Sequence, residues 1–211
     1  TGSSEPITTL SELQCQTTQS GVLDLDYSDD VIDLNVLETY TSVTYEWFKV
    51  TTSGSDEQYY QAPTTYSLAG NTALKGEEWR CIIIYTDIHD TDLSISEESA
   101  AVTIGNTHPV VSNVSLSETA FYTGTELSCN YDSLEDADEE DSLTALYAWY
   151  VGSTESTMSV STNDTESTYT VQADDNFVRC EITPNDGDED GDSVASNNME
   201  KSNTSPEFTG G

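Results

Sequence analysis

The sequence repeats itself around its cysteines, and this repeat limits the folds open to the chain more than any other feature. The residues around the second cysteine of the first half, Glu78-Trp79-Arg80-Cys81, correspond to Phe177-Val178-Arg179-Cys180, although the chain has only two arginines. In the same way Tyr45-Glu46-Trp47-Phe48 corresponds to Tyr147-Ala148-Trp149-Tyr150. Self-similarity of this kind indicates that one structural unit occurs twice.

Each half carries the order cysteine, tryptophan, cysteine, and this order favours one pairing of the four cysteines. Four cysteines allow three pairings, and the repeat selects Cys15–Cys81 and Cys129–Cys180. Closing a loop of roughly 50 residues stabilises a fold by about 4 kcal/mol in the chain-entropy description. The alternative is four free, buried cysteines, which a secreted chain would oxidise. Zinc and thiol redox chemistry have little support, because no Cys-x-x-Cys motif is present and the chain has only two histidines.

Joints that contain proline divide the chain. Asn106-Thr107-His108-Pro109 matches Asn203-Thr204-Ser205-Pro206, and Ser4-Glu5-Pro6 resembles the same joint. The prolines recur after 103 and 97 residues, which is an ordinary length for one domain. We predict a first domain over 1–106, a second over 107–205, and a tail or the start of a further repeat over 206–211.

Short alternating segments with turn signals every 8–12 residues predict an all-β fold. In the second half the expected strands cover 110–117, 126–132, 144–151, 168–171, 176–183 and 193–199. In the first half they cover 13–18, 43–51, 65–68, 78–86 and 99–104. Alternation turns each cysteine pair and one tryptophan inward, so each bridge is expected to join the two sheets of a sandwich.

The first half departs from this pattern at its start. Nine positions separate the proline of its joint from Cys15, against twenty before Cys129. Its first strand is therefore expected to be short or missing. An insert over 21–40 holds two candidate extra strands, Val22–Tyr27 and Val31–Val36, and one of them could replace the missing strand. If neither does, the open sheet edge could accept a strand from a neighbouring subunit.

The chain carries a net charge of −35, from 40 acidic and five basic residues. This charge repels the phosphates of nucleic acids and anionic membrane surfaces, and it favours cations as companions. The acidic residues gather in blocks between segments that hold the aromatic residues, which indicates acidic loops on a folded chain rather than disorder. No apolar run approaches the roughly 18 residues of a membrane span, so we expect no insertion into a membrane.

The joints, the acidic loop near residue 138, the Trp149-Tyr150 strand and the segment Arg179-Cys180-Glu181-Ile182-Thr183-Pro184-Asn185-Asp186-Gly187 together resemble immunoglobulin-like repeats of very large bacterial and archaeal cell-surface proteins of the adhesin type. The resemblance is close over 106–208 and looser over 4–105. It implies two tandem immunoglobulin-like β-sandwich domains in an extracellular repeat protein or filament. It also implies a non-catalytic spacer or adhesive role, with other copies, other repeats or a cell-surface ligand as partners.

The acidic loops are the candidate metal sites. In an immunoglobulin-type sandwich, the loops after the strands expected at 126–132 and 176–183 lie at one end, where their carboxylates would surround the joint. Ca²⁺ takes six to eight oxygen ligands and would offset the repulsion. The candidate ligands are Asp136, Asp138, Asp141, Asp186, Asp188 and Asp190 in the second half, and Asp24, Asp26, Asp87 and Asp90 in the first. The spacing does not fit an EF-hand, and the alternative is the solvated acidic surface of a salt-adapted protein.

The remaining candidates concern surface chemistry. Asn-x-Ser/Thr sequons mark Asn113, Asn163 and Asn203 for glycosylation. Tyrosines 59, 60 and 66 could stack on sugar rings, so a carbohydrate- or protein-ligand-binding module is the alternative function. Paired carboxylates can hydrolyse glycosides, but no apolar pocket or neighbouring basic partner is implied, and we expect no enzymatic activity. The two arginines should face outward and pair with a carboxylate on a neighbouring strand.

Overall fold

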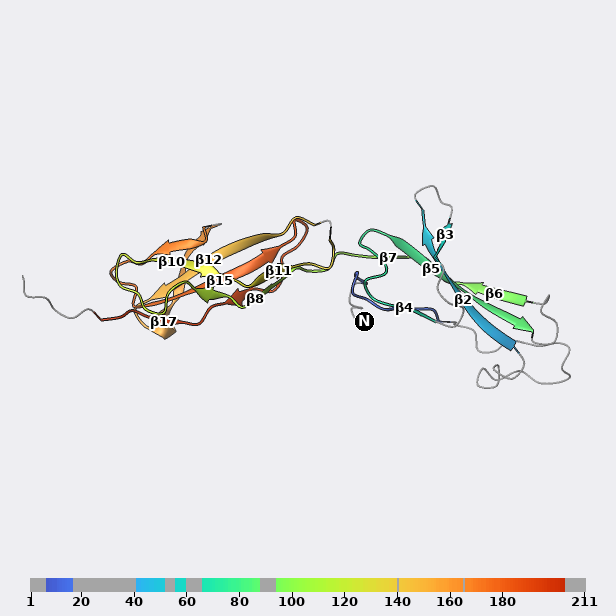
Figure 1. The fold of residues 1–211 in the computed structure, drawn as a ribbon, viewed down its shortest axis with the longest axis horizontal. Helices are drawn as coiled ribbons and strands as arrows, with labels where there is room; N and C mark the ends of the chain where they lie inside the picture. Colours follow the sequence, from blue (N-terminus) through green and yellow to red (C-terminus); the bar gives the residue numbers. More distant parts are fainter. Residues whose placement is uncertain are drawn as a thin grey trace, which may run out of the picture. The chain divides into compact units, whose positions relative to one another are not determined.

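A computed structural model describes the chain in seven segments. They cover residues 7–16, 41–51, 56–59, 66–87, 94–139, 141–164 and 166–203. Within them the fold is all-β, as predicted, with one 3₁₀ turn (η2, Glu155–Thr157) and no α-helix. The chain divides into two compact units, unit 1 (Thr1–Thr107) and unit 2 (His108–Gly211), and Figure 1 labels most of their strands.

The helix content also bears on membranes. Among the described residues, no helix has the length and apolar character that a membrane span requires.

Unit 2 consists of antiparallel strands in two layers that a disulfide joins. One layer has the order β13-β12-β15-β16, with β17 also on β15, and the other has the order β14-β10-β9. These strands are β9 (Ser115–Leu116), β10 (Glu126–Asn130), β12 (Thr144–Gly152), β13 (Ser159–Asp164), β14 (Thr168–Thr170), β15 (Phe177–Asn185), β16 (Val194–Ala195) and β17 (Met199–Glu200). The arrangement is consistent with a β-sandwich.

The first two predicted strands of unit 2 are each interrupted. A further pair, β8 (Val110–Ser112) and β11 (Ser133–Glu135), continues the pairing of β9 with β10 without a shift of register. The interruption falls at Asn113, whose φ of 53° lies in the left-handed region that is unfavourable for most residues but tolerated by Asn. Its side-chain amide donates to the Asp132 carboxylate at 2.8 Å, which bridges the gap between the two strands.

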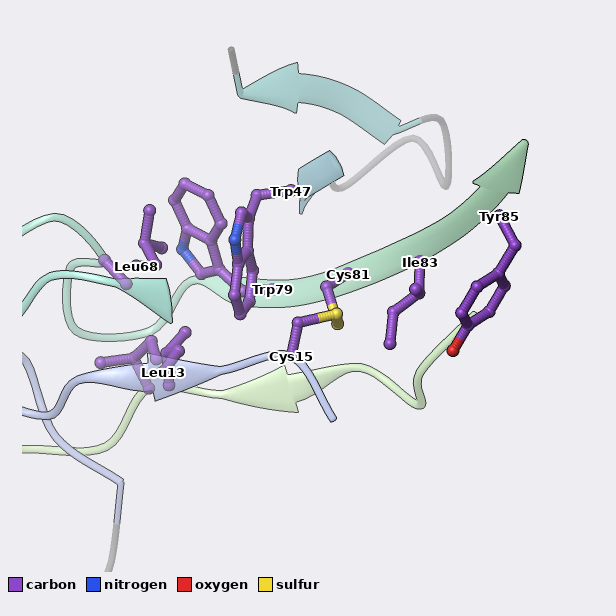
Figure 2. Close-up of a cluster of buried hydrophobic side chains, with 10 residues drawn as sticks. Leu13, Cys15, Trp47, Leu68, Trp79, Cys81, Ile83 and Tyr85 are labelled. Carbon is purple, nitrogen blue, oxygen red and sulfur yellow. A yellow bond between two sulfur atoms is a disulfide. The ribbon is translucent and has the colours of Figure 1, made fainter. Parts of the chain in front are cut away.

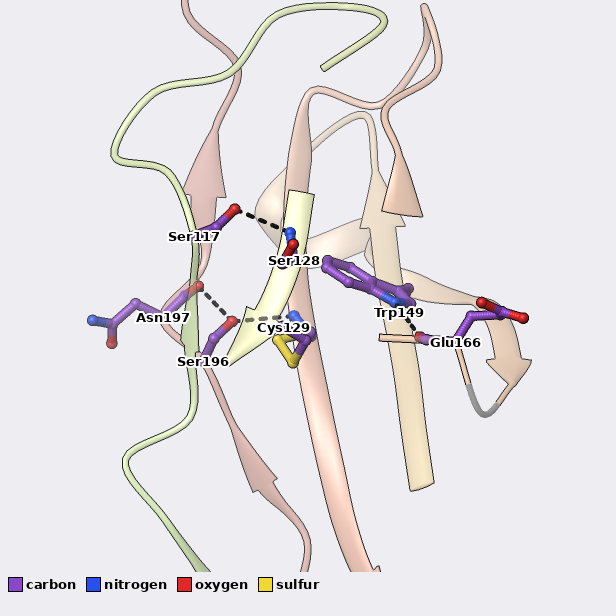
Figure 3. Close-up of a disulfide and its surroundings, with 8 residues drawn as sticks. Ser117, Ser128, Cys129, Trp149, Glu166, Ser196 and Asn197 are labelled. Carbon is purple, nitrogen blue, oxygen red and sulfur yellow. Dashed lines mark hydrogen bonds between the residues drawn. A yellow bond between two sulfur atoms is a disulfide. The ribbon is translucent and has the colours of Figure 1, made fainter. Parts of the chain in front are cut away.

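The core of unit 2 lies around the Cys129–Cys180 disulfide, which joins β10 in one layer to β15 in the other. Burial alternates along the whole of β15, as the period of two in a strand requires. Trp149 is 1% exposed and stacks on Tyr169, with 5.5 Å between ring centroids. Its indole N–H donates to the carbonyl of Glu166 at 3.3 Å, as Figure 3 shows beside the disulfide.

The repeated aromatic and arginine motifs form one cross-strand arrangement. On β12 and β15, Trp149 lies opposite Cys180 and Tyr150 lies opposite Arg179. Because neighbouring side chains point to opposite faces, the first pair enters the core and the second faces outward. The guanidinium of Arg179 lies 4.4 Å from the centre of the Tyr150 ring, within cation–π range. The matching pairs in unit 1 are Trp47 with Cys81 and Phe48 with Arg80.

Unit 1 has a four-strand path and a smaller two-stranded sheet. The path has the order β3-β2-β5-β6, with β7 also on β5, and the smaller sheet pairs β1 with β4. These strands are β1 (Leu13–Gln14), β2 (Thr41–Val50), β3 (Asp56–Tyr59), β4 (Ser67–Leu68), β5 (Glu78–Asp87), β6 (Ser94–Glu98) and β7 (Val102–Thr103). The predicted Cys15–Cys81 bond ties the segment after β1 to β5, beside Trp47 and Trp79 in Figure 2. The insert over 21–40 lies outside the described residues.

The prediction for the two arginines holds for one of them. Arg80 forms an ion pair with Glu98 on the neighbouring strand β6. Arg179 instead has its carboxylate partner, Glu181, two residues further along β15 at 3.8 Å. The position that corresponds to Glu98 is Ala195 of β16, which pairs with Glu181 as Glu98 pairs with Ile82, so β16 offers no carboxylate there.

The start of unit 1 has the same hydrogen bonds as the segment before β10. The carbonyl of Ile7 accepts the N–H of Gly105 at 2.7 Å, and the carbonyl of Phe121 accepts the N–H of Ser202 at 2.9 Å. Gly105 and Ser202 both lie two residues beyond the last strand of their unit. Ile7 therefore takes the place of Phe121.

The next residues give the same correspondence. The N–H of Thr8 donates to the Ser11 hydroxyl at 2.9 Å, and the N–H of Tyr122 donates to the Thr125 hydroxyl at 3.0 Å. The carbonyl of each first residue then accepts the N–H of the second, at 2.9 and 3.1 Å. Every matching pair of residues from Ile7 to Cys15 is separated by the same number of positions along the chain. The segment from Ile7 to Cys15 therefore corresponds to the segment from Phe121 to Cys129.

This correspondence corrects the prediction made from the first joint. Pro6 precedes Ile7 directly, so it falls at the position before Phe121 and does not match Pro109. The residues between Pro6 and Cys15 therefore do not hold a shortened first strand, because they correspond to the segment that follows β9 in unit 2. The described part of unit 1 holds no counterpart of β8 and β9.

A serine near the end of each unit completes the hydrogen bonds of the second cysteine. The N–H of Ser196 donates to the Cys180 carbonyl at 2.9 Å, and its hydroxyl accepts the Cys180 N–H at 3.1 Å. Ser99 makes the same two bonds to Cys81, at 2.9 and 3.0 Å. Both serines lie where the last strand is interrupted, so a side chain supplies the acceptor that a regular strand would provide.

We expect Ser196→Ala to destabilise unit 2 by about 1–3 kcal/mol, because it leaves the buried N–H of Cys180 without an acceptor. Denaturant unfolding of the full chain measures the loss. The matched control is Ser193→Ala, which removes an exposed hydroxyl bonded to Thr183 at 2.6 Å and should cost less than about 0.5 kcal/mol. Equal losses in the two variants would contradict the role given to Ser196.

Candidate metal centre

Two acidic loops of unit 2 meet at one end of strands β12 and β15. Strands β12 and β15 pair from Thr144 opposite Asn185 to Gly152 opposite Phe177, so the chain enters β12 and leaves β15 at the same end. The Thr144 hydroxyl also donates to the Asn185 carbonyl at 3.3 Å. The loop before β12 and the loop after β15 therefore meet, as the sequence predicts for the two loops.

Three of the six predicted carboxylates of unit 2 come together there. Asp136, Asp141 and Asp186 each offer one carboxylate oxygen, and these oxygens all lie within 4.8 Å of one another. Asp186 is buried and the other two are half-buried. Hard oxygen donors at this separation suit Ca²⁺, which would complete its coordination with further oxygens. In the part of the chain that the structure describes, this is the one group of three that could hold a metal ion.

The other three predicted ligands of unit 2 lie outside the cluster. Asp138 is buried, with 6% exposure, but it is not part of the group of three. Asp188 is exposed, and its N–H donates to Asp186 Oδ1 at 2.7 Å. Asp190 is exposed as well, and its carboxylate accepts the side-chain N–H of Asn185 at 2.8 Å.

Hydrogen bonds between aspartates and nearby backbone order both loops. Asp186 Oδ1 accepts the N–H groups of Asp188 and Glu189, both at 2.7 Å, and Asp136 Oδ1 accepts the N–H of Asp138 at 2.7 Å. Such local turns are typical of aspartate. Each carboxylate keeps a second oxygen, so the same residue can order its loop with one oxygen and face the cluster with the other.

Asp136 is the member of the cluster whose buried charge is the most unfavourable. Its Oδ2 is buried and has no hydrogen-bond partner. Burial raises the pKa of its carboxyl, the bond from the Asp138 N–H opposes this, and the charges of Asp138, Asp186 and Asp141 raise it further, so that the pKa lies above its usual 3.8. A buried carboxylate among like charges is costly unless a cation compensates it.

The start of unit 2 lies against the second of these loops. His108 Nδ1 is 3.3 Å from Glu189 Oε2. A Cβ atom on Gly191 would come within 1.9 Å of the Pro109 carbonyl oxygen, so only glycine allows the loop to approach this closely. The acidic loop after β15 therefore flanks the segment that begins unit 2, as the sequence predicts.

The candidate ligands of unit 1 are mostly outside the described residues. Asp24, Asp26 and Asp90 fall there. Asp87 ends β5 and pairs with Thr41 of β2, but its side chain is not among those described. The calcium prediction for unit 1 stays a prediction.

The candidate surface residues are distributed over both units. Asn113 and Asn203 are exposed, which a glycosylation site requires, and Asn163 lies on β13. Tyr66 is 51% exposed, and two tyrosines that the sequence analysis did not select, Tyr122 and Tyr131, are 44% and 37% exposed. Periodicity places Tyr131 on the face of Leu127 and Cys129 in the expected strand 126–132, but β10 ends at Asn130, so that prediction is wrong for Tyr131. Tyr122 lies before β10, where periodicity gives no signal.

We expect Asp136→Asn to stabilise unit 2 at pH 7 in calcium-free buffer. The raised pKa means that the folded state binds this proton more tightly than the unfolded state. The charged Asp136 carboxylate therefore destabilises the fold fully above the folded pKa, and this destabilisation disappears as pH falls below about 4. The advantage of the variant should disappear over the same range. Denaturant unfolding between pH 7 and pH 3.5 measures it, with the exposed Glu139→Gln as a charge-matched control. If the variant is less stable than the native chain at pH 7, the charged Asp136 carboxylate does not destabilise unit 2 and the explanation is wrong.

The comparisons with known proteins leave the function to be argued from these residues. The chain matches no known protein family, and it matches none of the curated proteins.

Proposed function

We propose that the chain is a non-catalytic structural or adhesive module of an extracellular or cell-surface repeat protein or filament. The observation that carries the proposal is the recurrence of one framework in both units. The tryptophan opposite a bonded cysteine, the arginine over an aromatic ring and the serine on the cysteine backbone occur in unit 1 and again in unit 2. Tandem copies of one framework fit the spacer and adhesive repeats that the sequence resembles.

The strand order of unit 2 supports an immunoglobulin-like assignment. A three-stranded layer, β14-β10-β9, is joined by a disulfide to a layer with the order β13-β12-β15-β16. A buried tryptophan on the strand next to β15 packs near this bond. These are features of immunoglobulin-like sandwiches, and the corresponding strands of unit 1 support the same assignment.

The compartment follows from the disulfides. Two of them, Cys15–Cys81 and Cys129–Cys180, indicate an oxidising environment outside the cell or on its surface. A net charge of −35 disfavours nucleic acid as a partner. Other copies or repeats of the protein remain the partners that we propose.

We further propose that Ca²⁺ binds at Asp136, Asp141 and Asp186. The buried, unpartnered Oδ2 of Asp136 supports this proposal beyond the mere presence of acidic residues. The role of the ion would be to join the loop before β12 to the loop after β15, and so to stiffen the end of unit 2 at which the chain enters it.

We expect about 10 mM Ca²⁺ to stabilise unit 2 by about 1.4 kcal/mol, for a dissociation constant of about 1 mM, as is common in extracellular modules. Thermal unfolding at matched ionic strength measures the effect. Asp141→Asn should abolish it, whereas Glu139→Gln, which removes an exposed charge from the same loop, should leave it unchanged. The calcium proposal fails if Ca²⁺ does not stabilise the native chain beyond matched salt, or if the Asp141 variant responds like the native chain.

The alternative function, a carbohydrate-binding module, rests on the exposed tyrosines. We expect a glycan array to retain none of the full-length chain, because a sugar site needs several aromatic rings on one surface and the exposed tyrosines occur on both units. Retention by the native chain that is lost in one of the variants Tyr66→Ala and Tyr131→Ala, and kept in the other, would contradict this expectation. The carbohydrate-binding function would then replace the structural one.

A further inference from the structure

The loop after β15 contains both Asp-Gly pairs of the chain. They are Asp186-Gly187 and Asp190-Gly191, and the sequence has no Asn-Gly pair. An Asp-Gly bond is chemically labile, because glycine has no Cβ atom to hinder the attack of its nitrogen on the carboxyl group before it. The loop therefore holds the peptide bonds of this chain that are most prone to rearrangement.

The rearrangement is intramolecular and needs no reactant other than water. At the first pair, the Gly187 nitrogen would attack the Cγ atom of Asp186. The nitrogen loses its hydrogen, the carboxyl group loses a hydroxyl, and the two leave as water from a five-membered succinimide ring. Water then adds to either ring carbonyl and breaks its bond to nitrogen. The products are aspartate or isoaspartate, in which the main chain runs through the side-chain methylene.

The second Asp-Gly pair is held by main-chain bonds. The N–H of Gly191 donates to the Pro184 carbonyl at 2.9 Å, and a β-bridge pairs Asn185 with Asp190. Gly191 also packs against Pro109, whose carbonyl oxygen would lie 1.9 Å from an added Cβ atom. Because the N–H is engaged and the backbone around it is closely packed, we expect the Asp190-Gly191 bond to be stable in the folded chain.

The first Asp-Gly pair is held by a side chain instead. The N–H of Gly187 donates to Asn185 Oδ1 at 2.9 Å in an exposed bond, and Gly187 is itself exposed. The carboxyl group that it would attack stays near, since Asp186 Oδ1 accepts the N–H groups of Asp188 and Glu189, both at 2.7 Å. Its side chain is thus folded back over the residues that follow. Among the described residues, Asn185 supplies the acceptor that occupies the Gly187 nitrogen.

The Asn185 side chain is fixed from both sides. Its Nδ2 donates to Asp190 Oδ1 at 2.8 Å, and its main chain ends β15 opposite Thr144 of β12. The amide can therefore keep its oxygen toward Gly187. Asparagine and aspartate are the residues that make this local turn best, which gives the position a conservative substitute.

We propose that Asp186 is a site of spontaneous isomerisation and that Asn185 is the positioning residue that protects it. While the Asn185 oxygen holds the Gly187 N–H, the nitrogen does not release its hydrogen and the ring does not close. When this bond is lost, the succinimide ring closes and isoaspartate forms. Such a modification lies beyond the proposed structural function, and it does not depend on bound calcium.

Isoaspartate at Asp186 opens the loop after β15. The main chain gains a methylene and the carboxylate is displaced, so that the two bonds of Asp186 Oδ1 to the Asp188 and Glu189 N–H groups cannot both be kept. Asp186 is only 4% exposed, so the change falls in the packed part of unit 2. We expect the modified chain to unfold at a lower denaturant concentration than the native chain.

The experiment incubates the full-length chain in calcium-free buffer at neutral pH. Peptide mapping with electron-transfer fragmentation measures isoaspartate at Asp186 and Asp190 over time. In denaturant, both positions should form it. In the folded chain, both should be slow. Asn185→Ala removes the acceptor and should speed isomerisation of Asp186 about 2- to 10-fold, the factor that corresponds to one hydrogen bond, with Asp190 unchanged.

Asn185→Asp is the matched control. Both variants lose the Nδ2 bond to Asp190, but only the alanine variant loses the oxygen that accepts the Gly187 N–H. The aspartate variant should therefore stay close to the native rate at Asp186. Equal rates in the two variants, or a rise at Asp190 that equals the rise at Asp186, would assign the effect to general opening of the loop and overturn the role of Asn185.

A slow reaction at Asp186 in denaturant would overturn the labile site itself. The calcium and glycan measurements use the unmodified chain, so failure of the proposed function and failure of the isomerisation proposal remain distinguishable.

Discussion

The fold of each unit depends on a covalent bond between a large layer and a small one. In the described part of unit 1 the small layer consists of two strands of two residues each, which provide few backbone bonds of their own. The disulfide links close separations of 66 and 51 residues, and loops of that size stabilise a fold by about 4 kcal/mol. This is a large part of the 5–15 kcal/mol by which domains are stable. The tryptophans and the serine then complete a core that the bond has already drawn together.

The sequence predicted those parts of the fold that carry their own signal. Strand β15 alternates buried and half-buried residues over its whole length, so its position and its inward cysteine could be read directly. Strand β13 could not, because Ser159–Asp164 contains one large apolar residue and is a strand only through its pairing with β12. Pro6 misled for a related reason. A proline marks a joint locally, whereas the correspondence of Ile7 with Phe121 depends on bonds to the far end of each unit.

The acidic cluster of unit 2 was predictable as a place but not as a set of residues. The order of the strands brings the two acidic loops together, and this followed from the expected immunoglobulin-type sandwich. The choice of Asp136, Asp141 and Asp186 over Asp188 depends on the turn in which the Asp188 N–H donates to Asp186. Sequence spacing does not reveal which aspartate orders a loop and which follows the turn away from the cluster, since all of them are the same residue type.

Charge links two of the proposals for this chain, calcium binding and association with other copies. A net charge of −35 opposes the approach of a second copy, and burial together with neighbouring carboxylates raises the pKa of Asp136 inside one copy. A cation bound between the loops of unit 2, as we propose, would offset the second effect, and dissolved salt screens the first. At an ionic strength of about 0.1 M the screening length is about 10 Å, shorter than a domain. Repulsion between copies is then local.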